Sequence, residues 1–203
     1  MTILMAFQTP EDGIIVLATI FGNITTKDAT RNALLLCEAA GYLDVPVVEG
    51  SSEPLKATYF YLLQIQKKID KSVSEFLVEK VSDPGEVSIL ALGPLTNLVL
   101  AVKRDSIFAS NVKRVVVLGD SFFALGNVNP AAEANVGDFF PNGYANIDVV
   151  GINITTQVKL KDADLEKLKQ SEGKHAKFVC DMCKFYRDWH LKSEYFWMTD
   201  NAS

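Results

Sequence analysis

Short runs of aliphatic residues recur along this chain, and they constrain its fold more than any other feature. They occupy residues 14–21, 45–48, 87–92, 114–118 and 147–152. Most of them are apolar throughout, which indicates strands that are buried on both faces. Because stretches with helical patterns separate the runs, the sequence predicts an α/β fold. We expect a mostly parallel, open sheet with helices on both of its faces.

The expected helices lie between these runs and in the C-terminal part of the chain. They extend from Thr25 or Thr26 to Gly41, over residues 72–82, from Pro94 to about Arg104, and from Asp162 to about His190 with a break near Gly173. Residues 51–71 are harder to interpret, since only a helix-like core stands out in them. We expect a single domain over residues 1–203, with residues 161–193 as a helical tail.

Composition and charge argue against several classes of function. Among the 203 residues, 25 acidic and 20 basic side chains give a net charge of −5, which does not suit a nucleic-acid binder with a basic face. No apolar run is long enough to span a membrane, and no targeting segment is recognisable, so we expect a cytoplasmic location. Cys180 and Cys183 form a CxxC, but it lies in a helical pattern, which favours packing over a zinc or redox site.

A polar loop follows the run at 114–118 and is the first candidate for a functional site. Its sequence, LGNVNPAAEAN, places Asn127, Glu133 and Asn135 among apolar residues. Amides and a carboxylate can each bridge two hydroxyl groups of a sugar ring, and a loop after a buried strand is where α/β proteins place their sites. The alternative is a plain turn, because Asn and Gly are also turn-forming residues.

Three further segments, together with this loop and the tail, resemble a known family. They are TIFGNITTKDATRNALLLCEAAG at 19–41, ILALGPLTNLVLA at 89–101 and IDVVGINITTQVKL at 147–160. In order and spacing the chain is similar to the inosine/uridine-preferring nucleoside hydrolases, and it resembles their plant members in particular. The resemblance implies hydrolysis of the N-glycosidic bond of purine or pyrimidine ribonucleosides, by a water that a bound calcium ion activates.

The resemblance also implies roles for individual residues. Asn23, Asn127, Glu133 and Asn135 match ribose-binding positions, Leu118 matches a position that packs against the sugar, and the backbone carbonyl of Thr96 matches a calcium ligand. No GxGxxG or GxxxxGK[ST] motif supports a nucleotide-binding domain instead. His175 and His190 lie in the helical tail, where packing or surface roles are expected.

One part of the family pattern is missing from this sequence. The acidic cluster DTDPGIDD, which supplies most calcium ligands and the general base, has no counterpart here, so no catalytic residue is identified. We expect a chain truncated at both ends, with poor calcium binding and weak or no activity. The alternative is a non-catalytic product that retains ribose binding, forms a homo-oligomer, or pairs with a full-length homologue.

Overall fold

The computed structural model describes residues 2–9, 13–53, 72–119 and 146–192 of the chain. It divides into two compact units, each of which is described by itself. The larger unit comprises residues 3–157, and the smaller comprises residues 158–203 with Met1–Thr2. Within the described residues the chain forms eight helices and five strands.

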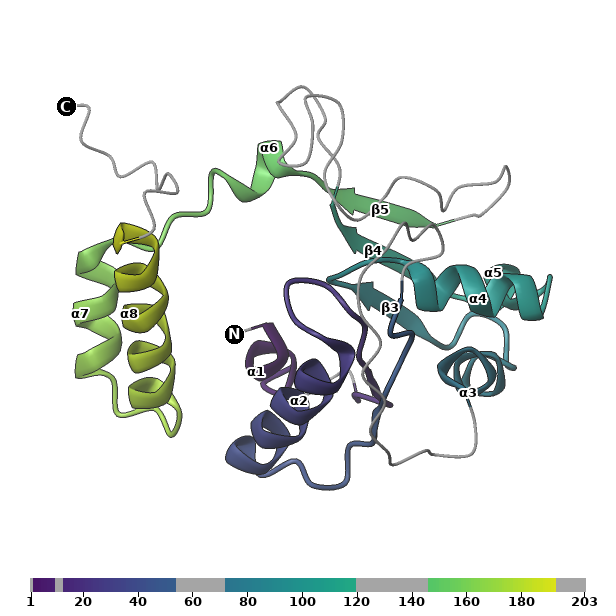
Figure 1. Ribbon diagram of the computed structural model, residues 1–203, viewed down its shortest axis with the longest axis horizontal. Coiled ribbons are helices and arrows are strands. Elements are labelled where there is room, and N and C mark those ends of the chain that lie inside the picture. The colour runs from purple at the N-terminus through teal and green to yellow at the C-terminus, as the bar shows by residue number, and fades with distance from the viewer. Residues whose placement is uncertain (1, 10–12, 54–71, 120–145, 193–203) are drawn as a thin grey trace. The chain divides into compact units, whose positions relative to one another are not determined.

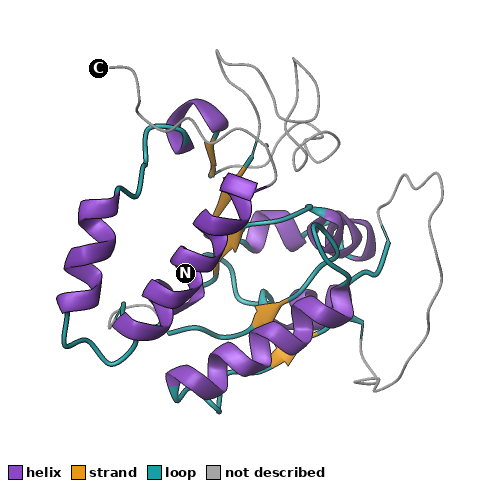
Figure 2. Ribbon diagram, turned by 60° about the vertical axis from the view of Figure 1, so that its left-hand side comes forward, coloured by secondary structure: helices purple, strands orange, loops and turns teal. Residues whose placement is uncertain are grey.

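All five strands pair in parallel, which confirms the α/β fold predicted from the apolar runs. β1 (Leu17–Ala18) pairs with β2 (Val47–Val48). β4 (Arg114–Leu118) lies between β3 (Ser88–Ala91) and β5 (Ile147–Val150), as Figure 1 shows. The strands therefore form two hydrogen-bonded groups, of two and of three members, which are drawn in orange in Figure 2.

The helices of the larger unit cover a wide range of lengths. They are α1 (Thr2–Ala6, which begins in the smaller unit), α2 (Thr26–Ala40), α3 (Val73–Lys80), α4 (Thr96–Arg104), α5 (Phe108–Asn111) and α6 (Ile152–Thr155). The predictions for α2, α3 and α4 are confirmed, although α4 begins two residues after Pro94. The sequence did not predict α1, α5 or α6, because four or five residues are too few to establish a helical period.

Helix α2 shows how the local sequence defines its own ends. Thr25 has extended backbone angles, and its hydroxyl oxygen accepts a hydrogen bond from the Asp28 N–H over 3.2 Å. At the other end Gly41 has φ 82°, a left-handed conformation that glycine adopts without steric cost. Tyr42 follows and stacks on Phe7 with ring centroids 4.1 Å apart, which fastens the residue after α1 to the end of α2.

The core of the larger unit lies where α3, α4 and α5 meet the three-stranded sheet. Val117 of β4 and Ala101 of α4 are fully buried. The core cluster consists of Val48, Val73, Leu77, Val81, Leu95, Leu98, Ala101, Phe108, Val115 and Val117. Burial of these side chains holds α4 in a fixed position over the sheet, and so fixes the turn from which α4 starts.

Glu75 is expected to stabilise the α3–α4 pair only while its carboxylate is ionised. The Ser72 N–H donates to it over 2.9 Å, and Arg104 of α4 forms an ion pair with it. The backbone hydrogen bond from Ser72, and then the charge of Arg104, lower the pKa of Glu75. A lowered pKa means that the stabilisation is complete above the unfolded-state pKa of about 4.3, and is lost as pH falls through the folded-state pKa.

Glu75→Gln should therefore lower the midpoint of thermal unfolding at about pH 7 and leave it unchanged near pH 2. Circular dichroism at both pH values measures this difference. Glu86→Gln is the matched control, because Glu86 is an exposed carboxylate in the turn before β3. If Glu75→Gln lowered the thermal midpoint equally at both pH values, the ionised carboxylate would not be the source of the stabilisation.

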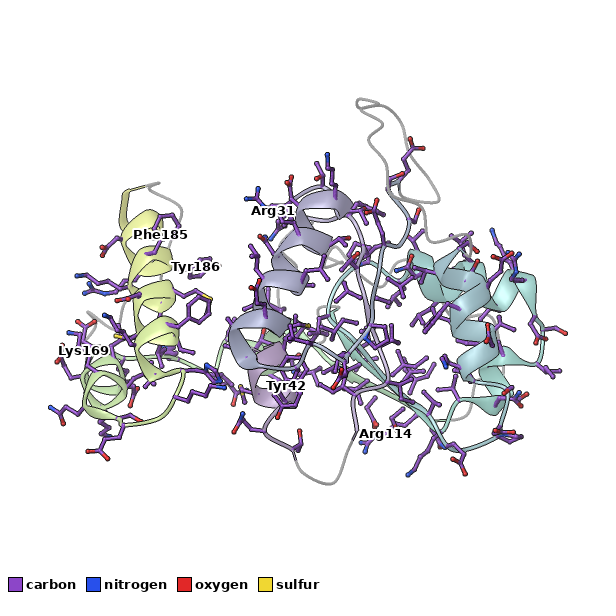
Figure 3. All side chains as sticks on the ribbon, turned by 90° about the horizontal axis from the view of Figure 1, so that it is seen from below. Arg31, Tyr42, Arg114, Lys169, Phe185 and Tyr186 are labelled. Atoms are coloured by element: carbon purple, nitrogen blue, oxygen red, sulfur yellow. The ribbon has the colours of Figure 1, made fainter. Side chains whose placement is uncertain are left out.

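The smaller unit is a pair of helices, α7 (Asp162–Gln170) and α8 (Ala176–Lys192), with the predicted break between them. Leu165 and Cys180 are buried in this unit, and Arg187 forms an ion pair with Asp162 over 3.1 Å. Phe185, labelled on α8 in Figure 3, is 74% exposed.

None of the helices in the described part of the chain has the length and apolarity required to cross a bilayer.

Candidate functional site

Three of the expected site residues lie among the described residues, and each stands near the carboxyl end of a strand. Asn23 follows β1, Thr96 follows β3, and Leu118 ends β4. β3 and β4 belong to one sheet, so the segments with Thr96 and Leu118 share its carboxyl edge, where α/β proteins bind ligands; Asn23 follows a strand of the other, two-stranded group. The polar loop with Asn127, Glu133 and Asn135 lies outside the described residues, directly after Leu118 and Gly119.

Asn23 lies in an exposed bend between β1 and α2. The bend is closed by a hydrogen bond of 3.1 Å from the Gly22 N–H to the Ile24 carbonyl oxygen. Capping of α2, the structural alternative for Asn23, is performed by Thr25 instead. The Asn23 side chain makes no hydrogen bond to another described residue.

Thr96 is buried, 7% exposed, and is the first residue of α4. The N-cap of this helix is Leu95, whose aliphatic side chain cannot accept a hydrogen bond, so side-chain capping does not explain the threonine. In an α-helix, the carbonyl oxygen of the first residue accepts a hydrogen bond from the N–H four residues later. A metal ion at the Thr96 carbonyl would thus share that oxygen with the helix.

The exit of β1 lies directly beside the loop that joins β3 to α4. A Cβ placed on Gly22 would lie 3.9 Å from Cδ of Pro94, and one placed on Gly93 would lie 3.1 Å from Cγ2 of Ile20. Leu118 extends the same edge, because β4 pairs with β3 in parallel. The structure thus brings the neighbourhoods of Asn23 and Thr96 together.

A buried asparagine that the sequence analysis missed joins these segments. Asn97, 8% exposed, donates from Nδ2 to the Thr19 carbonyl oxygen over 2.9 Å, and its Oδ1 accepts from the Ser51 N–H over 3.0 Å. Thr26 of α2 donates to the Ser51 carbonyl oxygen over 2.7 Å. The sequence did contain a signal for Asn97, since a polar residue stands directly after Thr96 at a position where the predicted helix packs on the sheet.

The described residues include no ready-made acidic cluster of the kind that holds a calcium ion. Calcium takes six to eight oxygen ligands, mostly carboxylates and carbonyls. In the described ranges, no group of three or more His, Cys, Asp and Glu side chains is placed to hold a metal ion. Asp28, the acidic residue in the first turn of α2, already accepts a hydrogen bond from the Thr25 hydroxyl over 2.7 Å.

The thiols do not offer an alternative chemistry. Burial raises the pKa of the Cys37 thiol, and burial together with the neighbouring Cys180 raises the pKa of the Cys183 thiol. A raised pKa keeps a cysteine protonated at neutral pH, whereas a nucleophilic or metal-binding cysteine must be a thiolate. Cys180 is 4% exposed on α8. The CxxC is therefore part of the helix packing.

Comparison with known proteins gives a consistent picture over nearly the whole chain. The family profile described as "Inosine-uridine preferring nucleoside hydrolase" matches residues 1–202. "Uridine nucleosidase 1" of Arabidopsis thaliana is 60% identical to the chain over 96% of its length. "Probable uridine nucleosidase 1" of Oryza sativa subsp. japonica is 58% identical over 97%. The chain spans 65% and 68% of the lengths of these two relatives.

Solved structures agree with the sequence comparison. "Plant nucleoside hydrolase - PpNRh1 enzyme" superposes with a TM-score of 0.79 at 40% identity, and the match covers 95% of this chain and 68% of that one. "Purine-Preferring Ribonucleoside Hydrolase from Gardnerella vaginalis" gives a TM-score of 0.81 at 23% identity, covering 94% and 69%. The second likeness concerns the fold alone.

Proposed function

Because the chain belongs to the inosine-uridine preferring nucleoside hydrolase family, we propose that it acts on ribonucleosides of the uridine and inosine class. The reaction is hydrolysis of the N-glycosidic bond, which yields ribose and the free base. The observation that carries the proposal is the family match over residues 1–202. The chain spans just under two thirds of the Arabidopsis relative, so the activity of that whole protein is a proposal here.

In this proposal the sugar is recognised by polar side chains at the carboxyl edge of the strands. Asn23 and the loop residues Asn127, Glu133 and Asn135 hydrogen-bond the ribose hydroxyls, and Leu118 packs against the ring. Asparagine suits this role because one carboxamide both donates and accepts. Cleavage of a glycosidic bond builds positive charge on the sugar, and the carboxylate of Glu133 is suited to stabilise that charge.

The proposed activity of this chain on its own is weak. A calcium ion would activate the water and contact the ribose in the family reaction, with the Thr96 carbonyl as one ligand. In this proposal the weak activity reflects the missing counterpart of the family's acidic cluster, which would supply the other ligands and the general base. The second candidate function is ribose binding without catalysis, or pairing with a homologue of full length or a second copy. A cytoplasmic location remains part of the proposal.

Uridine binding and ribose release by the purified chain test both functions. We expect measurable binding of uridine by calorimetry, and slow or no release of ribose with calcium or with a chelator. Asn23→Ala should weaken uridine binding about tenfold, which is what the loss of a hydrogen bond to a buried polar ligand typically costs. Asn111→Ala, an asparagine at the end of α5, should bind uridine normally.

Two results would contradict the proposal. A folded chain that does not bind uridine would exclude the ribose site assigned to Asn23. Rapid calcium-dependent release of ribose would show that the chain completes a catalytic centre, and would refute the expected weak activity.

A further inference from the structure

We propose that Asn97 is a positioning residue of the ribonucleoside site, an inference that rests on the function proposed above. Its carboxamide holds the exits of β1 and β2 against the start of α4. Asn97 directly follows Thr96, and the Thr19 carbonyl that it binds lies four residues before Asn23. One side chain therefore fixes the distance between the asparagine assigned to ribose and the turn assigned to the metal.

The two hydrogen bonds of Asn97 require a carboxamide in one orientation. Its Nδ2 faces a carbonyl oxygen, that of Thr19, and its Oδ1 faces the N–H of Ser51. A carbonyl can only accept and an N–H can only donate, so the amide cannot be turned around. Leucine has a similar shape but lacks both functions, whereas aspartate keeps the acceptor and loses the donor when it is ionised.

The Asn97 side chain is closely packed by its neighbours. Gly50, between β2 and Ser51, lies so close that a Cβ on it would stand 2.4 Å from Nδ2 of Asn97. Thr19 is 9% exposed, and its hydroxyl shares a hydrogen bond of 2.7 Å with the hydroxyl of Thr30 on α2. Each segment that meets at Asn97 is thus held by at least one further contact, and water has little access to the carboxamide.

The first test compares Asn97→Leu with the unaltered chain by amide hydrogen exchange and by uridine binding. The Ser51 and Phe21 amides report on the two strand exits, because Ser51 donates to Asn97 and Phe21 donates to the Ser51 carbonyl over 3.4 Å. Their protection should fall about tenfold or more relative to Val115 of β4. The dissociation constant for uridine should rise about tenfold.

Asn97→Asp supplies a readout that a general loss of stability would not move. The aspartate carboxylate still accepts from the Ser51 N–H but cannot donate to the Thr19 carbonyl, so this variant removes one of the two hydrogen bonds and keeps the other. Protection at Ser51 should therefore stay nearer to that of the unaltered chain than it does in Asn97→Leu. Uridine binding should still weaken, because the exit of β1 is no longer held.

The matched control is Asn111→Asp. The side-chain amide of Asn111, the last residue of α5, also donates to a backbone carbonyl, that of Ser82, which lies before β3 at the amino end of that strand. It should change neither uridine binding nor exchange at Ser51.

Three outcomes overturn the proposal. They are a uniform loss of protection in Asn97→Leu, unaltered uridine binding despite local loss of protection, and protection at Ser51 that is as low in Asn97→Asp as in Asn97→Leu. If the unaltered chain fails to bind uridine, the proposed function fails by that result alone. In that case the exchange pattern still decides whether Asn97 holds the two exits.

Discussion

Gly50→Ala is expected to destabilise the chain strongly, although it adds a single methyl group. A Cβ at this position would stand 2.0 Å from the carbonyl oxygen of Thr19, and 2.4 Å and 2.7 Å from the two terminal atoms of the Asn97 side chain. No rotamer change relieves a contact with a backbone oxygen, so the backbone of β1 or β2 has to move. That movement breaks the hydrogen bonds between Asn97 and the two strand exits.

The expected size of the effect follows from these two contributions. Overpacking costs about 1–3 kcal/mol, and each buried polar group left unpaired costs about 1–3 kcal/mol. We expect a loss of roughly 3–5 kcal/mol in the free energy of unfolding, against a total of about 5–15 kcal/mol for a typical domain. Urea unfolding followed by far-ultraviolet circular dichroism measures it.

Gly13→Ala is the control for Gly50→Ala. A Cβ on Gly13 would meet nothing within 4 Å among the described residues, so the substitution should change the free energy of unfolding by no more than about 0.5 kcal/mol. Equal stabilities for the two alanine variants would show that the segment around Gly50 adapts, and that the close approach to Asn97 does not constrain it.

Phe108→Ala is the second substitution with a large expected effect. Phe108 begins α5 and is 3% exposed, in the core cluster with Leu98 of α4 and Val115 of β4. Removing a buried phenylalanine side chain typically costs about 3–5 kcal/mol, because apolar contacts are lost and the cavity collapses only in part. For a unit of this size the thermal midpoint should fall by roughly 10 °C.

Phe185→Ala makes the same chemical change where the ring is 74% exposed, on α8. It should alter the free energy of unfolding by about 0.5 kcal/mol at most. Circular dichroism suits both variants better than tryptophan fluorescence, since Trp189 and Trp197 lie in the C-terminal part of the chain. If Phe108→Ala were as mild as the control, the core assigned to the α4–α5 region would be wrong.

The fold could be predicted from the sequence because its strongest signals are local. The run at 114–118 coincides with β4, and Thr25 and Gly41 terminate α2 as their backbone preferences require. The two-residue strands β1 and β2 are shorter than the runs that predicted them. The length of each strand is set by its pairing with the other, and the hydrophobic pattern of a single segment carries no information about that pairing.

The candidate site could be predicted only in part. Parallel strands implied that Asn23 and Leu118 would lie at strand ends; Leu118 ends β4, whereas β1 ends at Ala18 and Asn23 lies in the bend before α2. Asn97 escaped notice because its partners are distant along the chain, with 78 positions separating it from Thr19. The ribose roles of Asn127, Glu133 and Asn135 stay predictions, since that loop lies outside the described residues.

The parallel pairing of the strands has a kinetic consequence. Leu17 pairs with Val47, Ser88 with Arg114, and Val115 with Ile147, so more than two dozen residues separate the partners in every pair. None of the described strands pairs with its neighbour as a hairpin, so each crossover has to close before its first strand contact is made. Slow, non-local pairing of this kind leaves strand edges open in the collapsed chain, and open edges favour aggregation until the crossovers have closed.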